Sequence, residues 1–307
     1  MNQPDKGLPL VSVIIPAFNH EQYVEQAINS VLTQTYPAVE MLVIDDASTD
    51  GTAGIAEKLA RQHGFKFIRN VENIGLNPTL EKGIHLSRGA YLSILASDDW
   101  IPPAKIEEQV ELIASGGLDA IYGTGWSVEG QDATLIDLGD LEAEFVEGTI
   151  LDRLYTDSSH APLLQSALIR RKPLIELLGD RRRFKSDDWV TLIRLVERYK
   201  VGFHNKPWFY YRQHSANTYR DYWFTLPIKT EVISLVSPES YRARGLSNML
   251  REQAQFLYMD RKRGLATKFL LSSMMLNPSI AGWTRLIAQL MHRVARRAIR
   301  RVTGRVG

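Results

Sequence analysis

The chain has 307 residues, of which 44% are hydrophobic and 23% charged, and its formal net charge is +2. This composition excludes a disordered chain, and the length suits one large domain or a domain with an appendage. The absence of cysteine excludes disulfides and thiolate metal sites. We expect neither a signal peptide, because residues 1–9 are polar, nor a membrane-spanning helix, because no apolar run approaches roughly 20 residues.

The first 115 residues alternate predicted strands and helices. Strands are expected at residues 11–15, 41–44, 65–69 and 91–95, and helices at about 21–34, 52–63, 78–87 and 102–114. The strands are short apolar runs with β-branched members, and the helices repeat apolar side chains every three to four positions. Such alternation predicts a mainly parallel α/β sheet flanked by helices. Neither a Gly-x-Gly-x-x-Gly loop after the first strand nor a Gly-Lys-Ser/Thr phosphate loop is present.

The pattern of the second half is less regular. A helix is expected around residues 192–196 and an aromatic strand at residues 208–212, and the chain looks helical from Tyr222 onward. We therefore predict a domain over residues 1–220 and a helical C-terminal region over residues 221–307.

Basic side chains are concentrated at the C-terminus. No acidic residue follows Asp260, whereas 11 lysine and arginine residues do, so the first 260 residues have a net charge of −9, which is +2 less 11. Within residues 280–307 apolar side chains form one helical stripe, with most arginines on the opposite side. This pattern predicts an anchor on an anionic membrane surface. Docking on the acidic body is the open alternative, and the scarcity of aromatic residues disfavours nucleic acid.

Two acidic doublets, Asp45-Asp46 and Asp98-Asp99, each follow a predicted strand. The carboxyl edge of an open α/β sheet is where ligands bind. Adjacent carboxylates are unfavourable when crowded or buried unless a positive group offsets them, and a divalent metal with a phosphorylated ligand is such a group. Helix caps or turn residues are the alternative for one doublet. Two doublets at strand ends favour a ligand site.

Six motifs in order resemble those of family 2 glycosyltransferases, which are inverting enzymes with the GT-A fold. They lie at residues 11–19, 43–52, 73–84, 97–99, 186–189 and 211–214. The resemblance covers roughly residues 10–219. Two positions depart from it: Ala96 stands where members often have the first Asp of Asp-x-Asp-Asp, and Glu81 stands where members often have Asn.

The resemblance implies a binding site for a nucleotide sugar. Asp46 would accept a hydrogen bond from the imide N–H of the base, which suits uracil, and Asp98 would hold the ribose. The residues expected to pack around the base and ribose are Pro16, Ala17 and Phe18. The resemblance also implies Mn²⁺ or Mg²⁺, held by Asp99 and Asp98 with His214 as a further candidate; such ions take one or two carboxylates plus phosphate oxygens.

By its register with a Glu-Asp motif of the family, Asp188 is the predicted general base, which must reach the proton that it removes. The alternative is that Asp187 caps a helix and Asp188 lies in its first turn. Weaker candidates for acceptor or sugar contact are Trp189, Asp187 and Trp100. For the two tryptophans, packing in the aromatic core is at least as strong an alternative.

Together these observations predict an inverting, metal-dependent glycosyltransferase that uses a nucleotide sugar, with UDP the expected nucleotide. It would extend a glycan or lipid-linked acceptor of a cell-surface polysaccharide, such as lipopolysaccharide, at the inner face of the cytoplasmic membrane. A nucleotidyltransferase on a related sheet and a non-catalytic nucleotide-sugar-binding module are the alternatives.

Overall fold

The computed structural model describes residues 7–157, 161–181, 187–214, 222–259 and 261–278. The chain divides into two compact units. The first comprises residues 1–154 and 160–217, and the second comprises residues 155–159 and 218–307. The predicted basic segment at residues 280–307 lies outside the described residues.

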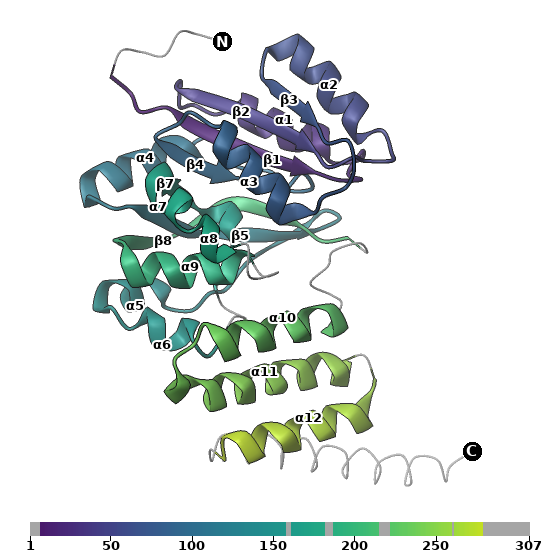
Figure 1. Ribbon diagram of the computed structural model, residues 1–307, viewed down its shortest axis with the longest axis vertical. Coiled ribbons are helices and arrows are strands. Elements are labelled where there is room, and N and C mark those ends of the chain that lie inside the picture. The colour runs from purple at the N-terminus through teal and green to yellow at the C-terminus, as the bar shows by residue number, and fades with distance from the viewer. Residues whose placement is uncertain (1–6, 158–160, 182–186, 215–221, 260, 279–307) are drawn as a thin grey trace. The chain divides into compact units, whose positions relative to one another are not determined.

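One mixed sheet organises the first unit (Figure 1). Its strands are β1 (Val11–Ala17), β2 (Val39–Asp45), β3 (Lys66–Arg69), β4 (Tyr91–Ile94), β5 (Ala120–Glu129), β6 (Asp132–Leu135), β7 (Leu168–Arg170) and β8 (Val201–Arg212). Their order is β3-β2-β1-β4-β7-β5-β6, and β8 pairs with β5. Strands β1 to β4 are parallel to one another, β7 runs antiparallel to both β4 and β5, β6 runs antiparallel to β5, and β8 is parallel to β5. The predicted mainly parallel sheet is therefore confirmed.

Helices connect and cover these strands. They are α1 (Val24–Leu32), α2 (Thr52–His63), α3 (Leu76–Leu86), α4 (Lys105–Gly116), α5 (Leu141–Glu147), α6 (Ile150–Leu154), α7 (Arg171–Glu176), α8 (Leu178–Arg181) and α9 (Asp187–Arg198), with a 3₁₀ turn η1 (Leu164–Ser166). The eight elements predicted over the first 115 residues are all present, with ends shifted by a few residues.

Strand β1 lies between two helix layers. Val13 and Ile15 share a buried cluster with Val24 and Ile28 of α1. Ile14 points the other way, because a Cβ added to Gly83 of α3 would lie 2.5 Å from its Cγ2. Since successive side chains of a strand alternate between faces, α1 and α3 cover opposite faces of the sheet. Burial on both faces explains why every residue of β1 except Ser12 is apolar.

Strand β1 extends past Pro16, where the sequence predicts its end. The carbonyl oxygen of Ile14 accepts from the backbone N–H of Leu95 on the β4 side. The carbonyl oxygen of Ala17 accepts from the backbone N–H of Asp46 on the β2 side. Backbone groups of alternate residues in a strand point to the same side. The N–H that Pro16 lacks would therefore face β4, as the carbonyl of Ile14 does. Because β4 ends at Ile94, the proline removes no ladder hydrogen bond there.

Strand β8 completes the core of the first unit. Trp208 and Phe209 are buried in the cluster that contains β1 and α1. A Cβ on Gly123 of β5 would lie 2.4 Å from Cε3 of Trp208, so the indole lies directly against the backbone of β5. The last strand among the described residues thus contributes two buried aromatic side chains to the core.

The second unit is helical, as predicted. Its helices are α10 (Tyr222–Leu235), α11 (Glu239–Met259) and α12 (Arg263–Leu276). Ala254 of α11 packs with Leu270 and Met274 of α12, and the hydroxyls of Ser247 and Ser273 lie 2.9 Å apart between these helices. Among the described residues, no helix has both the length and the hydrophobicity needed to span a bilayer.

Candidate active site

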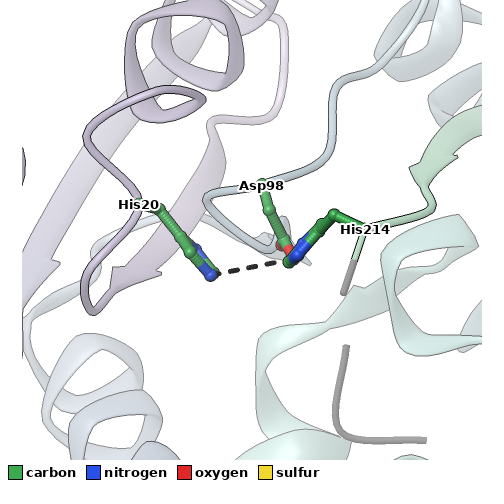
Figure 2. Close-up of side chains that lie close together, drawn as sticks. All are labelled: His20, Asp98 and His214. Atoms are coloured by element: carbon green, nitrogen blue, oxygen red, sulfur yellow. Dashed lines mark hydrogen bonds and ion pairs between the residues drawn. The ribbon is translucent and has the colours of Figure 1, made fainter. Parts of the chain in front are cut away.

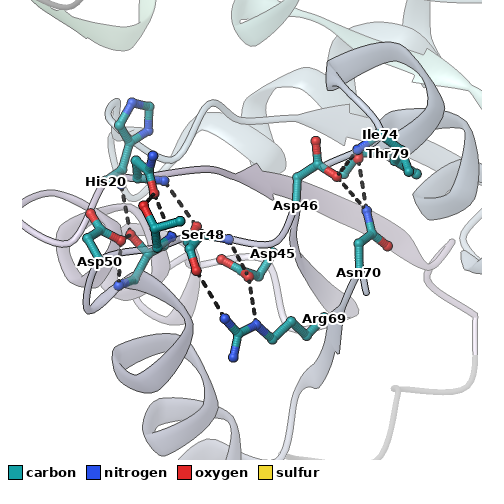
Figure 3. A network of polar contacts seen from close by, with 12 residues as sticks. His20, Asp45, Asp46, Ser48, Asp50, Arg69, Asn70, Ile74 and Thr79 are labelled. Atoms are coloured by element: carbon teal, nitrogen blue, oxygen red, sulfur yellow. Dashed lines mark hydrogen bonds and ion pairs between the residues drawn. The ribbon is translucent and has the colours of Figure 1, made fainter. Parts of the chain in front are cut away.

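The loops that follow β1 and β2 are joined by hydrogen bonds. Asn19 accepts from the backbone N–H of Thr49 (2.8 Å) and donates its own backbone N–H to Ser48 Oγ (3.0 Å). The next backbone N–H, that of His20, donates to Thr52 Oγ1 (2.8 Å; Figure 3). Asn19 adopts a left-handed conformation, with φ of 53°, which asparagine tolerates better than most residues. The two loops therefore form one preorganised edge beside the sheet.

Asp46 holds the segment after β3 in place (Figure 3). Its Oδ1 accepts from Asn70 Nδ2 (2.8 Å) and the backbone N–H of Ile74 (3.0 Å), and its Oδ2 accepts from the backbone N–H of Gly75 (2.8 Å). A carboxylate has about four acceptor positions. Contacts among the described residues therefore leave one position on Oδ2, which is where the predicted base N–H would bind.

The other member of this doublet is structural. Asp45 is fully buried, and its Oδ2 accepts from the backbone N–H of Ser48 (3.1 Å) and lies 3.4 Å from Nε of Arg69. Of the three residues predicted to surround the base and ribose, Pro16 and Ala17 are buried within β1, whereas Phe18 is 42% exposed just beyond it. Phe18 is therefore the side chain of the three that a ligand at this edge would meet.

Three residues from distant parts of the chain meet at the ends of β1, β4 and β8 (Figure 2). Asp98 Oδ2 lies 3.0 Å from His214 Nε2 and 3.8 Å from His20 Nε2. One ligand atom from each residue lies within 4.8 Å of the others. Two imidazoles and a carboxylate form a donor set that suits a divalent transition-metal ion, so these residues fit a metal.

His20 is the member of this cluster that the sequence motifs did not single out. Burial lowers the pKa of His20, and the negative charge of Asp98 opposes this shift. The sequence signal that could have found it is a histidine close after the first strand. The histidine can be recognised as a neighbour of Asp98 only once β1 is known to lie beside β4.

Asp99 lies outside the three-residue cluster. It is buried, its Oδ1 accepts from the backbone N–H of Arg212 (2.9 Å), and its Oδ2 accepts from Nε2 of Gln165 (3.2 Å). Burial, with the neighbouring charge of Asp98, raises the pKa of Asp99 well above its usual range. Asp99 therefore connects β4 to β8 and to η1.

Arg212 connects the second doublet to two aromatic rings. Its Nε donates to the carbonyl oxygen of Asp98 (2.9 Å), and its guanidinium lies 4.7 Å from the ring centre of Tyr23 and 4.6 Å from that of Trp100. Trp100 is also stacked on Tyr210, with ring centres 4.9 Å apart and planes 6° apart. This is the packing that the sequence allowed as the alternative for Trp100, and its contact with a sugar stays a prediction.

Asp188, the predicted base, is the second residue of α9 and is partly exposed. Its Oδ2 accepts from the backbone N–H of Leu164 at 3.4 Å. Gln165, which follows Leu164 in the turn η1, contacts Asp99. The single turn η1 therefore places Asp188 near the second acidic doublet.

The weaker candidates beside Asp188 differ in what can be said of them. Trp189 is 5% exposed, and its Nε1 donates to the carbonyl oxygen of Leu154 (2.8 Å), so its ring is packed in the unit. Asp187 begins α9, and its side chain lies outside the described part of the structure.

Comparison with known proteins identifies the family to which the chain belongs. The sequence model of the glycosyl transferase family 2 matches residues 12–178, which is more than half of the chain. The chain belongs to glycosyl transferase family 2. A relative in the family, the putative teichuronic acid biosynthesis glycosyltransferase TuaG of Bacillus subtilis, is 36% identical over 130 residues, which are 42% of this chain and 51% of TuaG. The match thus spans about half of that relative's length.

Solved structures show that the family 2 chain shares its fold with known enzymes. Staphylococcus aureus TarS in complex with UDP-GlcNAc has a TM-score of 0.58 at 18% identity, covering 86% of this chain and 81% of the other. The mannosyltransferase PcManGT of Pyrobaculum calidifontis, in complex with GDP-Man and Mn²⁺, has a TM-score of 0.61 at 16% identity, covering 94% and 81%. The predicted GT-A fold is confirmed.

Proposed function

We propose that the chain is an inverting, metal-dependent glycosyltransferase that moves a sugar from a UDP-sugar to a glycan or lipid-linked acceptor. One observation supports this most directly. Three carboxylates that the reaction would use at different points come from separate parts of the chain: Asp46 follows β2, Asp98 lies in the connection after β4, and Asp188 is the second residue of α9, where it accepts a hydrogen bond from the turn η1. Family membership supports the reaction class, and the positions of these side chains support the roles proposed for them.

The nucleotide would bind across the ends of β1 and β2. The remaining acceptor position on Asp46 Oδ2 suits the imide N–H of uracil, and the exposed ring of Phe18 would cover the base. TarS was solved with UDP-GlcNAc and PcManGT with GDP-Man, so this fold serves either nucleotide. Guanine also has a ring N–H, and the choice of UDP over GDP is therefore decided by the assay below.

Asp98 and His214, with Asp99 as the further predicted ligand, would hold Mn²⁺ or Mg²⁺ beside the diphosphate. Such an ion supplies Lewis-acid stabilisation of the leaving group. PcManGT was solved with Mn²⁺. The protein's own part at this point is to keep the carboxylate and the imidazole together, which the 3.0 Å contact between Asp98 and His214 does.

Asp188 would act as the general base. The acceptor hydroxyl oxygen forms the new bond to the anomeric carbon while the bond from that carbon to the nucleotide diphosphate breaks, and its electron pair leaves on the diphosphate. The hydroxyl proton passes to Asp188. Because there is one displacement from the face opposite the leaving group, the anomeric configuration is inverted. A positioned base of this kind contributes roughly 10²- to 10⁴-fold to the rate.

The acceptor proposal rests on the relatives and on the basic C-terminal segment. TuaG is described as a putative teichuronic acid biosynthesis enzyme, which supports a role in cell-surface polysaccharide synthesis. Residues 280–307 would keep the enzyme on the cytoplasmic face of the membrane, where a lipid-linked acceptor is available.

Release of the nucleotide diphosphate from a panel of UDP- and GDP-sugars, with and without Mn²⁺, tests the proposal. We expect metal-dependent release from at least one UDP-sugar and little from GDP-sugars. Pyrophosphate formation from a nucleoside triphosphate and a sugar phosphate would instead identify a nucleotidyltransferase. Nucleotide-sugar binding without any release would identify a binding module.

A further inference from the structure

We propose that His20 is a third protein ligand of the metal ion in this site, and that the resulting two-histidine, one-carboxylate set binds Mn²⁺ and other transition-metal ions in preference to Mg²⁺. The inference rests on the proposed function, because it extends the metal site of that function by one residue. It also changes the chemical character of the site, from oxygen donors to mainly nitrogen donors.

The spacing of the donor atoms supports this assignment. Metal–ligand distances of about 2.1 Å allow two ligands of one ion to lie up to about 4.2 Å apart. His214 Nε2 and His20 Nε2 lie 3.0 and 3.8 Å from Asp98 Oδ2, and the set as a whole falls within 4.8 Å. All three atoms can therefore reach one ion with at most small side-chain adjustments.

The orientation of the His20 ring is fixed in the way that a ligand requires. Its Nδ1 lies 2.8 Å from Ser97 Oγ, and its backbone N–H donates to Thr52 Oγ1. Metal-binding histidines commonly donate their second ring N–H to an oxygen, which fixes the tautomer. With the proton on Nδ1, the lone pair of Nε2 faces the carboxylate of Asp98. Two acceptors that face each other repel, and a cation between them would offset this repulsion.

The contacts of the Asp98-Asp99 doublet explain why most of the proposed ligand atoms from the protein would be nitrogen. Both oxygens of Asp99 already accept hydrogen bonds, from the backbone of Arg212 and the amide of Gln165. Asp98 is the carboxylate of this doublet that lies within reach of both imidazoles, so the proposed set consists of one carboxylate and two imidazoles. Mg²⁺ prefers oxygen ligands, whereas imidazole favours first-row transition metals. The site should therefore bind Co²⁺ or Zn²⁺ more tightly than Mn²⁺, and Mn²⁺ more tightly than Mg²⁺.

Titration of the full-length protein with Mn²⁺, followed by the electron paramagnetic resonance signal of the free ion, tests the role of His20. We expect the dissociation constant to rise at least tenfold in His20→Gln and to stay within twofold of the wild-type value in His63→Gln, which changes an exposed histidine of α2. Ser97→Ala, which removes the partner of Nδ1, should weaken binding less than His20→Gln does. Wild-type affinity in His20→Gln would overturn the proposal, as would Mg²⁺ competing as well as Mn²⁺.

Pulsed electron paramagnetic resonance of the wild-type protein with bound Mn²⁺ provides a test that needs no variant. Two imidazole ligands should give couplings from two ligand nitrogens in the wild-type spectrum. A spectrum with coupling to one imidazole would overturn the assignment even if His20→Gln failed to fold. These readouts are separate from turnover: active enzyme with unchanged Mn²⁺ binding in His20→Gln rejects the inference, whereas absence of release from every nucleotide sugar rejects the proposed function.

Discussion

The side-chain amide of Gln165 donates a 3.2 Å hydrogen bond to Oδ2 of Asp99. The preceding residue, Leu164, donates its backbone N–H to Asp188. Consecutive residues of one short turn therefore contact both the predicted base and a carboxylate of the predicted metal site. This shared turn should keep the side chains of Asp99 and Asp188 at a constant separation, which matters because catalysis is sensitive to displacements of about 1 Å.

The role of Asp188 predicts that Asp188→Asn abolishes transfer. The amide has nearly the same shape but cannot accept the hydroxyl proton, so kcat should fall by about 10²- to 10⁴-fold. Affinity for UDP should stay within twofold of the wild-type value, because the proposed role of Asp188 is on the acceptor hydroxyl and not on the nucleotide. Asp132→Asn, at an exposed position in β6, is the matched control. Near wild-type turnover in Asp188→Asn would mean that another group removes the proton.

The single acceptor position left on Asp46 predicts a preference for uracil over cytosine. Cytosine has a ring acceptor where uracil has the imide N–H, so CDP would place two acceptors in opposition. Since a hydrogen bond to a charged group contributes about 1.5–3 kcal/mol, UDP should bind roughly 10- to 150-fold more tightly than CDP. In Asp46→Asn this ratio should fall below about threefold. Calorimetric titration measures both ligands, with Glu57→Gln as control; an unchanged ratio in Asp46→Asn would place the base elsewhere.

The buried Lys105 predicts a stability that rises with pH. Its side chain is fully buried with Nζ 2.8 Å from Ser93 Oγ, and burial lowers the pKa of Lys105 from 10.5 to about 7. The folded form loses the proton above pH 7, whereas the unfolded form keeps it to about pH 10.4. Between these values unfolding takes up a proton, so the free energy of unfolding increases with pH, by at most roughly 1.4 kcal/mol per unit. Below pH 7 both forms are protonated and this contribution is constant.

Urea unfolding at pH 6, 7, 8 and 9 measures this dependence. Relative to the wild-type protein, Lys105→Met should be more stable at pH 6 and 7, and this advantage should shrink by pH 9. Lys58→Met, at an exposed position of α2, should keep the wild-type slope. A constant difference between Lys105→Met and wild type over this range would show that Lys105 is paired in its charged form.

The basic C-terminal segment predicts salt-sensitive membrane binding. Each arginine near an anionic leaflet contributes on the order of 1 kcal/mol. The full chain should float with phosphatidylglycerol vesicles at about 0.1 M salt and dissociate as the Debye length shortens at about 1 M. Replacing Arg296, Arg297, Arg300 and Arg301 with glutamine should abolish flotation, as should removal of residues 280–307. Undiminished flotation of either variant would reject the anchor.

The strands and helices of the first 115 residues could be predicted because each has a strong local signal. Apolar runs with β-branched members mark the strands, and the three-to-four spacing of apolar side chains marks the helices. The chain order of these elements also restricts the sheet to a parallel arrangement. The extension of β1 through Pro16 could not be predicted, because it depends on which neighbouring strand has already ended.

The later strands depend on partners that local patterns do not reveal. Residues 201–204 and 208–212 look like separate segments because Asn205, Lys206 and Pro207 resemble a turn, yet they form the single strand β8. The register against β5 shifts between Gly123 and Thr124, where Pro207 pairs. Strand β7 has three residues and inserts between β4 and β5. Such pairings are decided by long-range packing.

The same limit explains what was found and what was missed in the site. Asp46 and Asp98 could be singled out because acidic doublets after apolar runs are a local pattern. The proximity of His20 to Asp98 follows from the neighbouring positions of β1 and β4, and that of His214 follows from the path of β8. Likewise, the stacking of Trp100 on Tyr210 requires the pairing of those two residues.

The late position of β8 in the sequence, together with its contribution to the core, has a consequence for the protein during its synthesis. A nascent chain that has emerged only as far as α9 contains Asp46, Asp98 and Asp188, but it lacks the Trp208 ring against β5 and the Arg212 N–H on Asp99. Its carboxyl edge is then open to water and missing one imidazole. Ribosome-bound chains of this length should therefore bind neither the proposed donor nor the proposed metal with native affinity, and the proposed site should form only after residue 214 has left the ribosome.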